Sequence, residues 1–403
     1  MVAVGVIPAF LLGASVVEIR RQFDVPPAAL GGLVGLFFGC SAIASGPAGK
    51  LTERIGSWNG MSVSAIGAAA CLAGIALLAR DIPSLGGLLV LGGLANGLAN
   101  PAANLVLVET MPVHRRALAL GVKQAAIPSA TLLAGLSIPL LALTLGWRSA
   151  FLGAATVALL LALECASRGR AAPIASRSLA RGSTRGAGSI NRVTVMLAVG
   201  ATLGIWGGQA MGTFLVSYGV DLGLSVSEAG LVLTSASLAG IASRIVAGWI
   251  VDRRGGTGID ELAIMLGIGA GGLLLISVGS PSLVFVGAIP AFAGGWGWSG
   301  VLTFAVVRAN PASPAAATGI TQAGVFVGAT LGVPAFGLIT EAASFETAWV
   351  ATSASALAAL LIVKLAGRQL GNAESAIPTG SGLRAISGPR ARSGPRARSG
   401  PRD

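Results

Sequence analysis

Apolar stretches of about 20 residues recur along the whole chain, and they limit its fold more than any other feature of the sequence. Of the 403 residues, 54% are hydrophobic and 10% are charged, whereas roughly 25% of an average soluble domain is charged. The mean hydropathy is +0.81. Because a bilayer core about 30 Å thick takes roughly 20 apolar residues per helix, we interpret the chain as an all-α integral membrane protein.

Charges, Pro-Gly clusters and Asp or Ser helix starts divide the apolar sequence into separate segments. A count of eleven segments stays open, because the fifth and sixth meet at the short break TLGWRSAF. The first begins at Met1 with no arm before it, so a start further upstream also stays open. We expect twelve spans, near 1–17, 28–49, 59–79, 84–108, 117–145, 148–166, 193–218, 227–250, 262–279, 282–307, 317–341 and 346–366.

Lys and Arg are distributed unevenly between alternate loops, which predicts the orientation, because cytoplasmic loops retain positive charge. With the N-terminus inside, the cytoplasmic loops and tail hold 20 Lys and Arg, the opposite loops hold four and the spans hold three. We therefore expect a multi-pass protein of a bacterial inner membrane with both termini in the cytoplasm. The net charge of +12 reflects this topology and not a nucleic-acid partner, since no basic helix carries interleaved aromatic residues.

A hydrophilic segment at 167–192 separates two sets of six predicted spans. It is rich in Gly, Ser and Arg and lacks apolar periodicity, which is typical of a flexible linker. The C-terminus repeats the sequence SGPRAR, which cannot bury a core. We expect an N-terminal six-helix bundle at 1–166, the cytoplasmic linker, a C-terminal six-helix bundle at 193–366 and a disordered basic cytoplasmic tail at 367–403.

Two short motifs occur in both halves at nearly the same spacing. GKLTERIG at 49–56 aligns with GWIVDRRG at 248–255 at an offset of 199 residues. GVKQA at 121–125 aligns with GITQA at 319–323 at an offset of 198 residues. Two unrelated motifs that share almost one offset indicate a duplicated six-helix unit.

The paired loop motifs, the twelve spans and the basic linker resemble the major facilitator superfamily of secondary transporters, whose loop signature is G-x-L-a-D-R-x-G-r-[RK]. The first copy departs from the signature at Glu53 and at Ser57-Trp58, and the second lacks the small residue before its acid. The resemblance implies alternating access, with the first, fourth, seventh and tenth helices lining a central cavity. The resemblance also implies that the two loop motifs form a gate, which closes the cytoplasmic side in the outward-facing state. The alternative is that each motif is only a basic turn. The gate residues are Gly49, Glu53, Arg54, Gly56, Gly248, Asp252, Arg253 and Gly255.

Polar and aromatic side chains within the spans are the candidate substrate-binding residues, because an amide in hydrocarbon needs a partner or water. The fourth span places Asn96, Asn100 and Asn104 on one helix face, where cavity lining and bonds between helices both stay open as roles. Gln209 lies deep in the seventh span. Trp296 in the tenth span lies in the run GGWGWSG, where it either contacts a ligand or fills space.

Lys123 is the most unusual of these residues, since it lies about two turns inside the fifth predicted span, roughly 10 Å along the helix axis. It either snorkels to the cytoplasmic surface or faces the cavity and attracts an anion. Gln124 and its repeat partner Gln322 would then be symmetric hydrogen-bond partners. Arg244 in the eighth span adds a second positive charge or pairs with a loop acid. The segment resembles the GxKQ-type segment of bacterial members of the superfamily.

Enzyme signatures are missing from the sequence: it has no paired carboxylates, metal cluster, nucleophile elbow or phosphate-binding loop. We therefore expect no enzyme, no catalytic residue, no cofactor and no metal. The prediction is a monomeric secondary transporter in the lipid bilayer that moves a small polar or anionic organic solute. A multidrug efflux transporter and a non-transporting solute sensor of the same fold are the alternatives. Because all 15 acids lie in loops or near span ends, coupling to protons and facilitated diffusion both stay open.

Overall fold

The computed structural model of the chain describes residues 1–112, 123–171, 191–254, 257–310 and 313–375. Its regular elements are helical, and twelve of them in these ranges are long and apolar enough to cross a membrane. The expectation of an all-α membrane protein with twelve spans is thus confirmed. The elements are α1 (Val2–Ile19), α2 (Pro27–Ile55), α3 (Ser57–Leu78), α4 (Ile82–Thr110), α6 (Ala126–Ser137), the π-helical turn η2 (Ile138–Ala142), α7 (Leu143–Leu145), α8 (Trp147–Ala171), α9 (Arg192–Asp221), α10 (Val226–Arg254), α11 (Ile259–Ile276), α12 (Pro281–Ala309), α13 (Pro314–Ala342) and α14 (Phe345–Ser375).

The break between the fifth and sixth spans is a sharp turn at Gly146. The fifth span consists of α6, η2 and α7 together, Ala126–Leu145, and α8 begins at Trp147. Gly146 has a φ of 84°, which glycine adopts readily because it has no Cβ. The alternative of eleven spans is therefore wrong, since the chain reverses direction at this glycine.

Several helices extend beyond the spans that the apolar sequence predicts. α8 ends at Ala171 and α14 at Ser375, so helix continues into both the predicted linker, which starts at 167, and the predicted tail, which starts at 367. The predicted boundaries followed hydropathy, whereas a helix continues into polar residues for as long as no breaker ends it. Both helices thus continue past the predicted bundle ends at 166 and 366.

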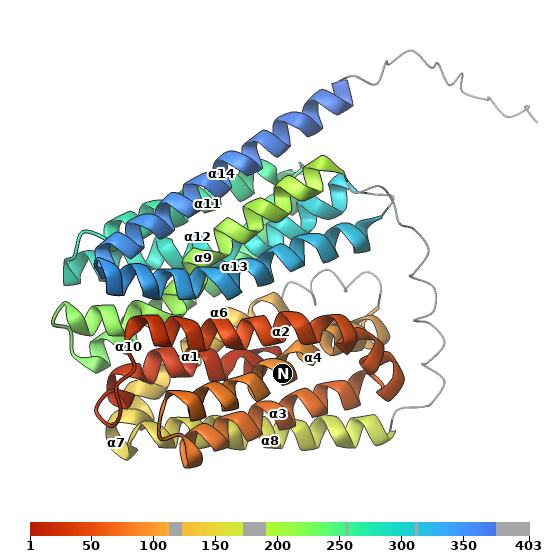
Figure 1. The fold of residues 1–403 in the computed structure, drawn as a ribbon. Helices are drawn as coiled ribbons and strands as arrows, with labels where there is room; N and C mark the ends of the chain where they lie inside the picture. Colours follow the sequence, from red (N-terminus) through yellow and green to blue (C-terminus); the bar gives the residue numbers. More distant parts are fainter. Residues whose placement is uncertain (113–122, 172–190, 255–256, 311–312, 376–403) are drawn as a thin grey trace, which may run out of the picture.

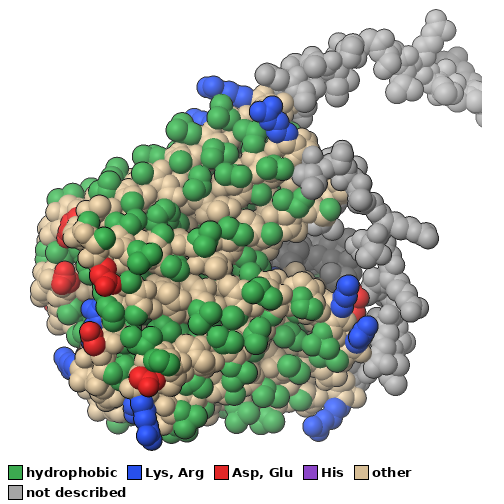
Figure 2. Space-filling view, in the orientation of Figure 1, with side chains coloured by type: hydrophobic (Ala, Val, Ile, Leu, Met, Phe, Trp, Pro, Cys, Tyr) green, Lys and Arg blue, Asp and Glu red, His purple; other side chains and the backbone are tan. Residues whose placement is uncertain are grey.

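The helices lie side by side, and their connections gather at two ends of the molecule (Figure 1). We call the end where α2 meets α3, where α8 ends and where α9 starts the linker end. The opposite end, with short turns after α1, α3, α7, α9, α11 and α13, is the hairpin end. Figure 2 shows hydrophobic side chains over the flank between the two ends, while Lys, Arg, Asp and Glu lie mainly at the ends. This distribution is what a bilayer-spanning bundle requires.

A capping box starts α4 at the hairpin end. The Asp81 side chain accepts a hydrogen bond from the backbone N–H of Ser84 at 2.9 Å, and the Ser84 hydroxyl faces the Asp81 backbone in return. These bonds satisfy N–H groups that a helix start leaves free. They also hold the pKa of Asp81 below its usual value, because the side chain and backbone of Ser84 both stabilise the carboxylate.

The helices before the linker and those after it touch along α2 and α13, α6 and α10, and α1 and α9. Glycines permit the close approach. A Cβ at Gly13 would lie 2.6 Å from the carbonyl oxygen of Thr213, and a Cβ at Gly135 would lie 2.7 Å from that of Gly230. Small residues at such contacts let helix backbones meet. Gly230 lies in the second turn of α10 and Gly13 in the second half of α1, so these two close approaches lie toward the hairpin end.

At the linker end the two sets of helices diverge. Figure 2 shows the surface hollowed there, between the helices that lie above and those that lie below in the view. α2 contacts α13 near the hairpin end, but further along α2, at Gly46 and Gly49, no heavy atom lies within 4 Å of the position where a Cβ would lie. The structure is therefore closed at the hairpin end and open at the linker end.

Candidate functional site

Trp296 lies at the centre of the molecule, between the two sets of helices. Its ring meets the ring of Phe10 of α1 edge to face, with centroids 6.2 Å apart and an interplanar angle of 84°. Gly208 of α9 packs against the same ring, where a Cβ would lie 2.9 Å from Trp296 Cε2. The side chain is 1% exposed. Three helices, α1, α9 and α12, thus meet at this indole, and all three are among the helices expected to line the cavity.

Arg244 of α10 lies against the same residue. Its Nε donates a hydrogen bond to the carbonyl oxygen of Trp296 at 2.8 Å, and its guanidinium carbon lies 5.9 Å from the centroid of the ring. Arg244 is buried, and its Nη1 has no hydrogen-bond partner. The acid partner that the sequence left open is thus not found among the described residues: the bond goes to a backbone carbonyl. A backbone carbonyl is neutral, so this bond does not balance the charge of the guanidinium.

Gln209 brings an acceptor to this region. It follows Gly208, the residue packed on the Trp296 ring, and is 4% exposed. Its Oε1 is buried without a hydrogen-bond partner, and so is the indole Nε1 of Trp296. Buried polar groups in proteins are nearly always hydrogen-bonded, so the free atoms of Arg244, Trp296 and Gln209 are candidates to bind a polar solute. They can supply an oxyanion with two donors and a hydroxyl or amine with one acceptor.

The asparagines of the fourth span have different surroundings, although one helix face carries them. Asn96 donates to Ser41 Oγ at 3.0 Å, and Ser41 in turn donates to backbone carbonyls of α2 and α4. Asn96 therefore joins α4 to α2, which is a bond between helices, the second of the two roles left open. Asn100 is half-buried, and Asn104 is exposed nearer the linker end.

Lys123 donates to Asn104 Oδ1 at 2.6 Å. It lies in a helical stretch three residues before α6, and it is half-buried. The predicted start of this span at 117 lies outside the described residues. The two amides of the repeat differ, since Gln124 is half-buried and Gln322 is exposed.

In the first copy of the loop motif, Gly56 is the turn itself. With a φ of 93° and a ψ of 152° it joins α2 directly to α3. Glu53 and Arg54 are exposed at the linker end. Ser57, where the family signature has a basic residue, donates to Glu109 Oε2 at the end of α4. Sequence reasoning missed this bond, although a carboxylate at the end of an apolar span was a visible signal.

The second copy of the motif ends α10. Arg253 stacks over the Trp249 ring, 4.0 Å from the centroid, and Arg254 pairs with Glu261 at 3.4 Å. Gly248 has open space around its Cβ position. Asp252 lies in the last turn of α10, and Gly255 lies outside the described residues.

Two polar contacts join the two sets of helices toward the hairpin end, and no motif in the sequence marked their residues as pairs. The backbone N–H of Ala28, in the first turn of α2, donates to Glu341 Oε2 of α13 at 3.2 Å. Nearer the middle, the hydroxyls of Thr131 and Ser237 share a buried hydrogen bond of 2.8 Å between α6 and α10. An acid beside a helix N-terminus is favourable, so these contacts hold the hairpin end closed.

Solved transporter structures share this arrangement of helices. A bacterial homolog of the human lysosomal transporter Spinster, in an inward-facing and occupied conformation, has a TM-score of 0.67 and 17% identity, with 93% of this chain and 94% of that chain covered. The xylose transporter XylE from E. coli, in a partially occluded inward-open conformation, has a TM-score of 0.68 and 16% identity, with 91% and 98% covered. A D-xylose–proton symporter has a TM-score of 0.66 and 17% identity, with 90% and 96% covered. At these identities the likeness shows the fold.

The sequence itself was compared with curated proteins and with family models. No curated protein matches the chain. The model of the Major Facilitator Superfamily matches residues 2–260, well over half of the chain. The resemblance that the loop motifs and the twelve spans carried is thereby confirmed, and the chain belongs to the Major Facilitator Superfamily.

Proposed function

We propose that the protein is a secondary transporter for a small organic solute with an anionic group, and that Arg244 binds this group. The observation that supports it is the buried guanidinium beside Trp296, with Nη1 unpartnered and no acid bonded to it among the described residues. An isolated buried charge costs on the order of several kcal/mol even after the protein relaxes. A carboxylate or phosphate on the solute would offset this cost through charge-assisted hydrogen bonds.

The neighbouring groups narrow the chemistry of the solute. The free Oε1 of Gln209 requires a donor, so a hydroxyl or amine next to the anionic group fits the site. The rings of Trp296 and Phe10 offer apolar contact to a short carbon skeleton. A neutral sugar would leave the charge of Arg244 uncompensated, which favours an anion such as a hydroxy acid or a small phosphorylated compound.

Lys123 lies nearer the linker end than this centre and serves, in our proposal, as the entry residue for the anion. Asn104 orients the ammonium group without neutralising it, because an amide carries no charge. Asn100, Gln124 and Gln322 complete the polar path. Two positive charges in series would raise the local concentration of anions and their rate of entry.

The transport cycle follows from the two ends of the molecule. The excess of Lys and Arg in the linker-end loops supports placing that end in the cytoplasm of a bacterial cell, so the open hollow would face inward. Residues 1–166 and 193–366 would then move as two bodies about the central site. The loop motifs would close the linker end in the other state, and the Glu341 and Thr131 contacts would open.

Ligand-induced stabilisation of the purified protein tests the proposed specificity. We expect at least one compound in a panel of hydroxy acids, dicarboxylates and sugar phosphates to raise the melting temperature, and xylose to leave it unchanged. A bound ligand stabilises only the folded state. Arg244→Gln should abolish this rise, whereas Arg170→Gln, at an exposed position on α8, should preserve it. A panel in which only neutral solutes stabilise the wild type would overturn the proposal.

A further inference from the structure

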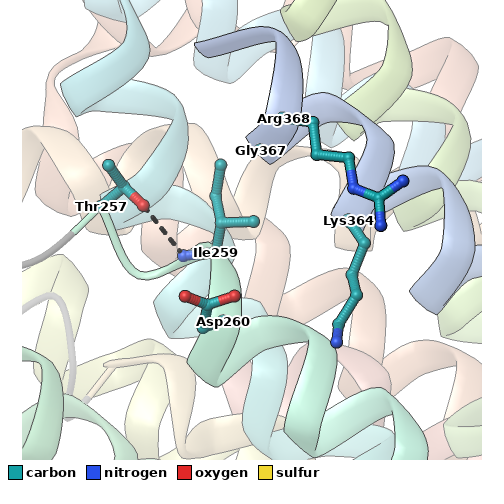
Figure 3. A pocket seen from close by; sticks show the side chains of 6 residues that line it. All are labelled: Thr257, Ile259, Asp260, Lys364, Gly367 and Arg368. Atoms are coloured by element: carbon teal, nitrogen blue, oxygen red, sulfur yellow. Dashed lines mark hydrogen bonds between the residues drawn. The ribbon is translucent and has the colours of Figure 1, made fainter. Parts of the chain in front are cut away.

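A polar cavity lies at the linker end between the start of α11 and the last turns of α14, away from the central site (Figure 3). Its volume is about 330 Å³. Gly367 forms part of its wall, where a Cβ would lie 2.8 Å from Ile259 Cγ2. The residues that line it are Thr257, Ile259, Asp260, Lys364, Gly367 and Arg368.

Charges of both signs line the cavity. Lys364 and Arg368 lie one turn apart on α14, and Asp260 lies in the first turn of α11. None of the three belongs to an ion pair within the part of the chain that the structure describes: the acid next to Asp260 in sequence, Glu261, pairs instead with Arg254. The cavity therefore offers two positive groups to an anion and one carboxylate to a cation.

Apolar side chains continue from the cavity toward the middle of the bilayer. On α11, Ile264 and Ile268 follow Asp260 at intervals of one turn and are 55% and 48% exposed. On α14, Leu361 and Leu357 precede Lys364 on the same face and are 60% and 42% exposed. Residues three and four apart share a helix face, so each helix presents a polar group at the linker end and exposed apolar groups beneath it.

We propose that this cavity binds the headgroup of a phospholipid that carries both a phosphate and an ammonium group. The phosphate lies between Lys364 and Arg368, and the ammonium lies against Asp260. The acyl chains follow the apolar faces of α11 and α14. A strictly anionic headgroup would leave Asp260 facing negative charge, which is unfavourable at this distance from a phosphate. The inference does not depend on what the transporter carries.

Native mass spectrometry of the full chain with added lipid tests this proposal. The wild type should bind phosphatidylethanolamine with 16- and 18-carbon chains as a resolved adduct, and both Lys364→Gln and Arg368→Gln should bind it about tenfold more weakly, as expected for the loss of one charge-assisted hydrogen bond. Arg170→Gln and Lys50→Gln remove exposed charges at the same end of α8 and α2. These two controls should bind the lipid like the wild type.

Two further experiments distinguish a headgroup with phosphate and ammonium groups from an anionic headgroup and from a soluble phosphorylated ligand. Asp260→Asn should weaken binding of phosphatidylethanolamine and leave binding of phosphatidylglycerol unchanged or stronger, because only the first needs a carboxylate. Soluble O-phosphoethanolamine should fail to displace the lipid at equal concentration, since it lacks the acyl chains. Equal binding by the wild type and both cation variants would overturn the site. Equal displacement by the soluble compound would overturn the lipid and indicate a soluble phosphorylated ligand.

Discussion

Gly135→Ala should open the hairpin end, because this glycine lies where α6 meets α10. A Cβ there would lie 2.6 Å from Thr234 Oγ1 and 2.7 Å from the carbonyl oxygen of Gly230, whereas ordinary contact begins at 3.4 Å. The hydroxyl of Thr234 can rotate away, but the carbonyl oxygen belongs to the backbone of α10 and moves only with the helix. The methyl group therefore forces the two helices apart by roughly 0.7 Å, or shifts the protein to the state in which they are already separate.

The size of the effect follows from the cost of overpacking, which is about 1–3 kcal/mol. Alanine also gains about 1 kcal/mol of helix propensity over glycine, but it does so in both states and leaves their ratio unchanged. A cost of 1–3 kcal/mol confined to the closed hairpin end shifts the equilibrium about 5- to 150-fold toward its opening. Gly271→Ala is the matched control, because no heavy atom lies within 4 Å of its Cβ position.

Spin labels at the hairpin end measure this shift directly. Arg80 and Val278 are exposed at that end, on opposite sides of the interface between the two sets of helices. Double electron–electron resonance between labels at these positions should show a longer distance gaining population in Gly135→Ala and not in Gly271→Ala. A folded Gly135→Ala protein with the distance distribution of the wild type would refute the account of hairpin-end closure.

Substitutions at three further positions test other parts of the account. Lys123→Gln should lower the initial rate of anion uptake into proteoliposomes about tenfold or more, and Lys123→Arg should retain a fraction of the wild-type rate. Normal uptake by Lys123→Gln would show that the lysine is only a surface anchor. Glu341→Gln removes the carboxylate from the N-terminus of α2, an interaction that contributes about 0.3–1 kcal/mol. The ratio of open to closed populations in the spin-label distances should therefore rise about two- to fivefold, and an unchanged distribution would contradict this role. Gly56→Ala forces a side chain to adopt a φ of 93° and a ψ of 152°, at a cost of about 1–3 kcal/mol, so the melting temperature of the purified protein should fall. An unchanged value would show that the turn adapts.

The twelve spans could be predicted because hydropathy over about 20 residues is a local property. The turn at Gly146 shows the limit of this reasoning. From the sequence alone it stayed open whether the fifth and sixth spans are one segment or two, because hydropathy does not show that one glycine has a positive φ. For a related reason α8 and α14 continue past 166 and 366, because hydropathy falls where the polar residues begin, whereas the helix continues through them.

The contacts of the candidate site are less accessible to sequence reasoning, since they join residues that are far apart in the chain. Arg244 was recognised as a charge within a span, but its partner is the backbone carbonyl of Trp296, 52 residues away. A backbone acceptor leaves no pattern in a sequence. The bond from Ala28 to Glu341 spans 313 residues and depends on how the two halves meet. Lys123 was singled out as unusual from the sequence, but its partner Asn104 is seen only in the structure.

The central claim is that Arg244 binds an anionic group of the transported solute. The most direct test is uptake into proteoliposomes of a radiolabelled organic anion that raises the melting temperature of the wild type. The account predicts saturable uptake by the wild type and by Arg170→Gln, and loss of uptake in a folded Arg244→Gln protein that is incorporated at the same level. Wild-type uptake of the anion by Arg244→Gln would contradict the claim, because the buried guanidinium would then have no part in binding the solute.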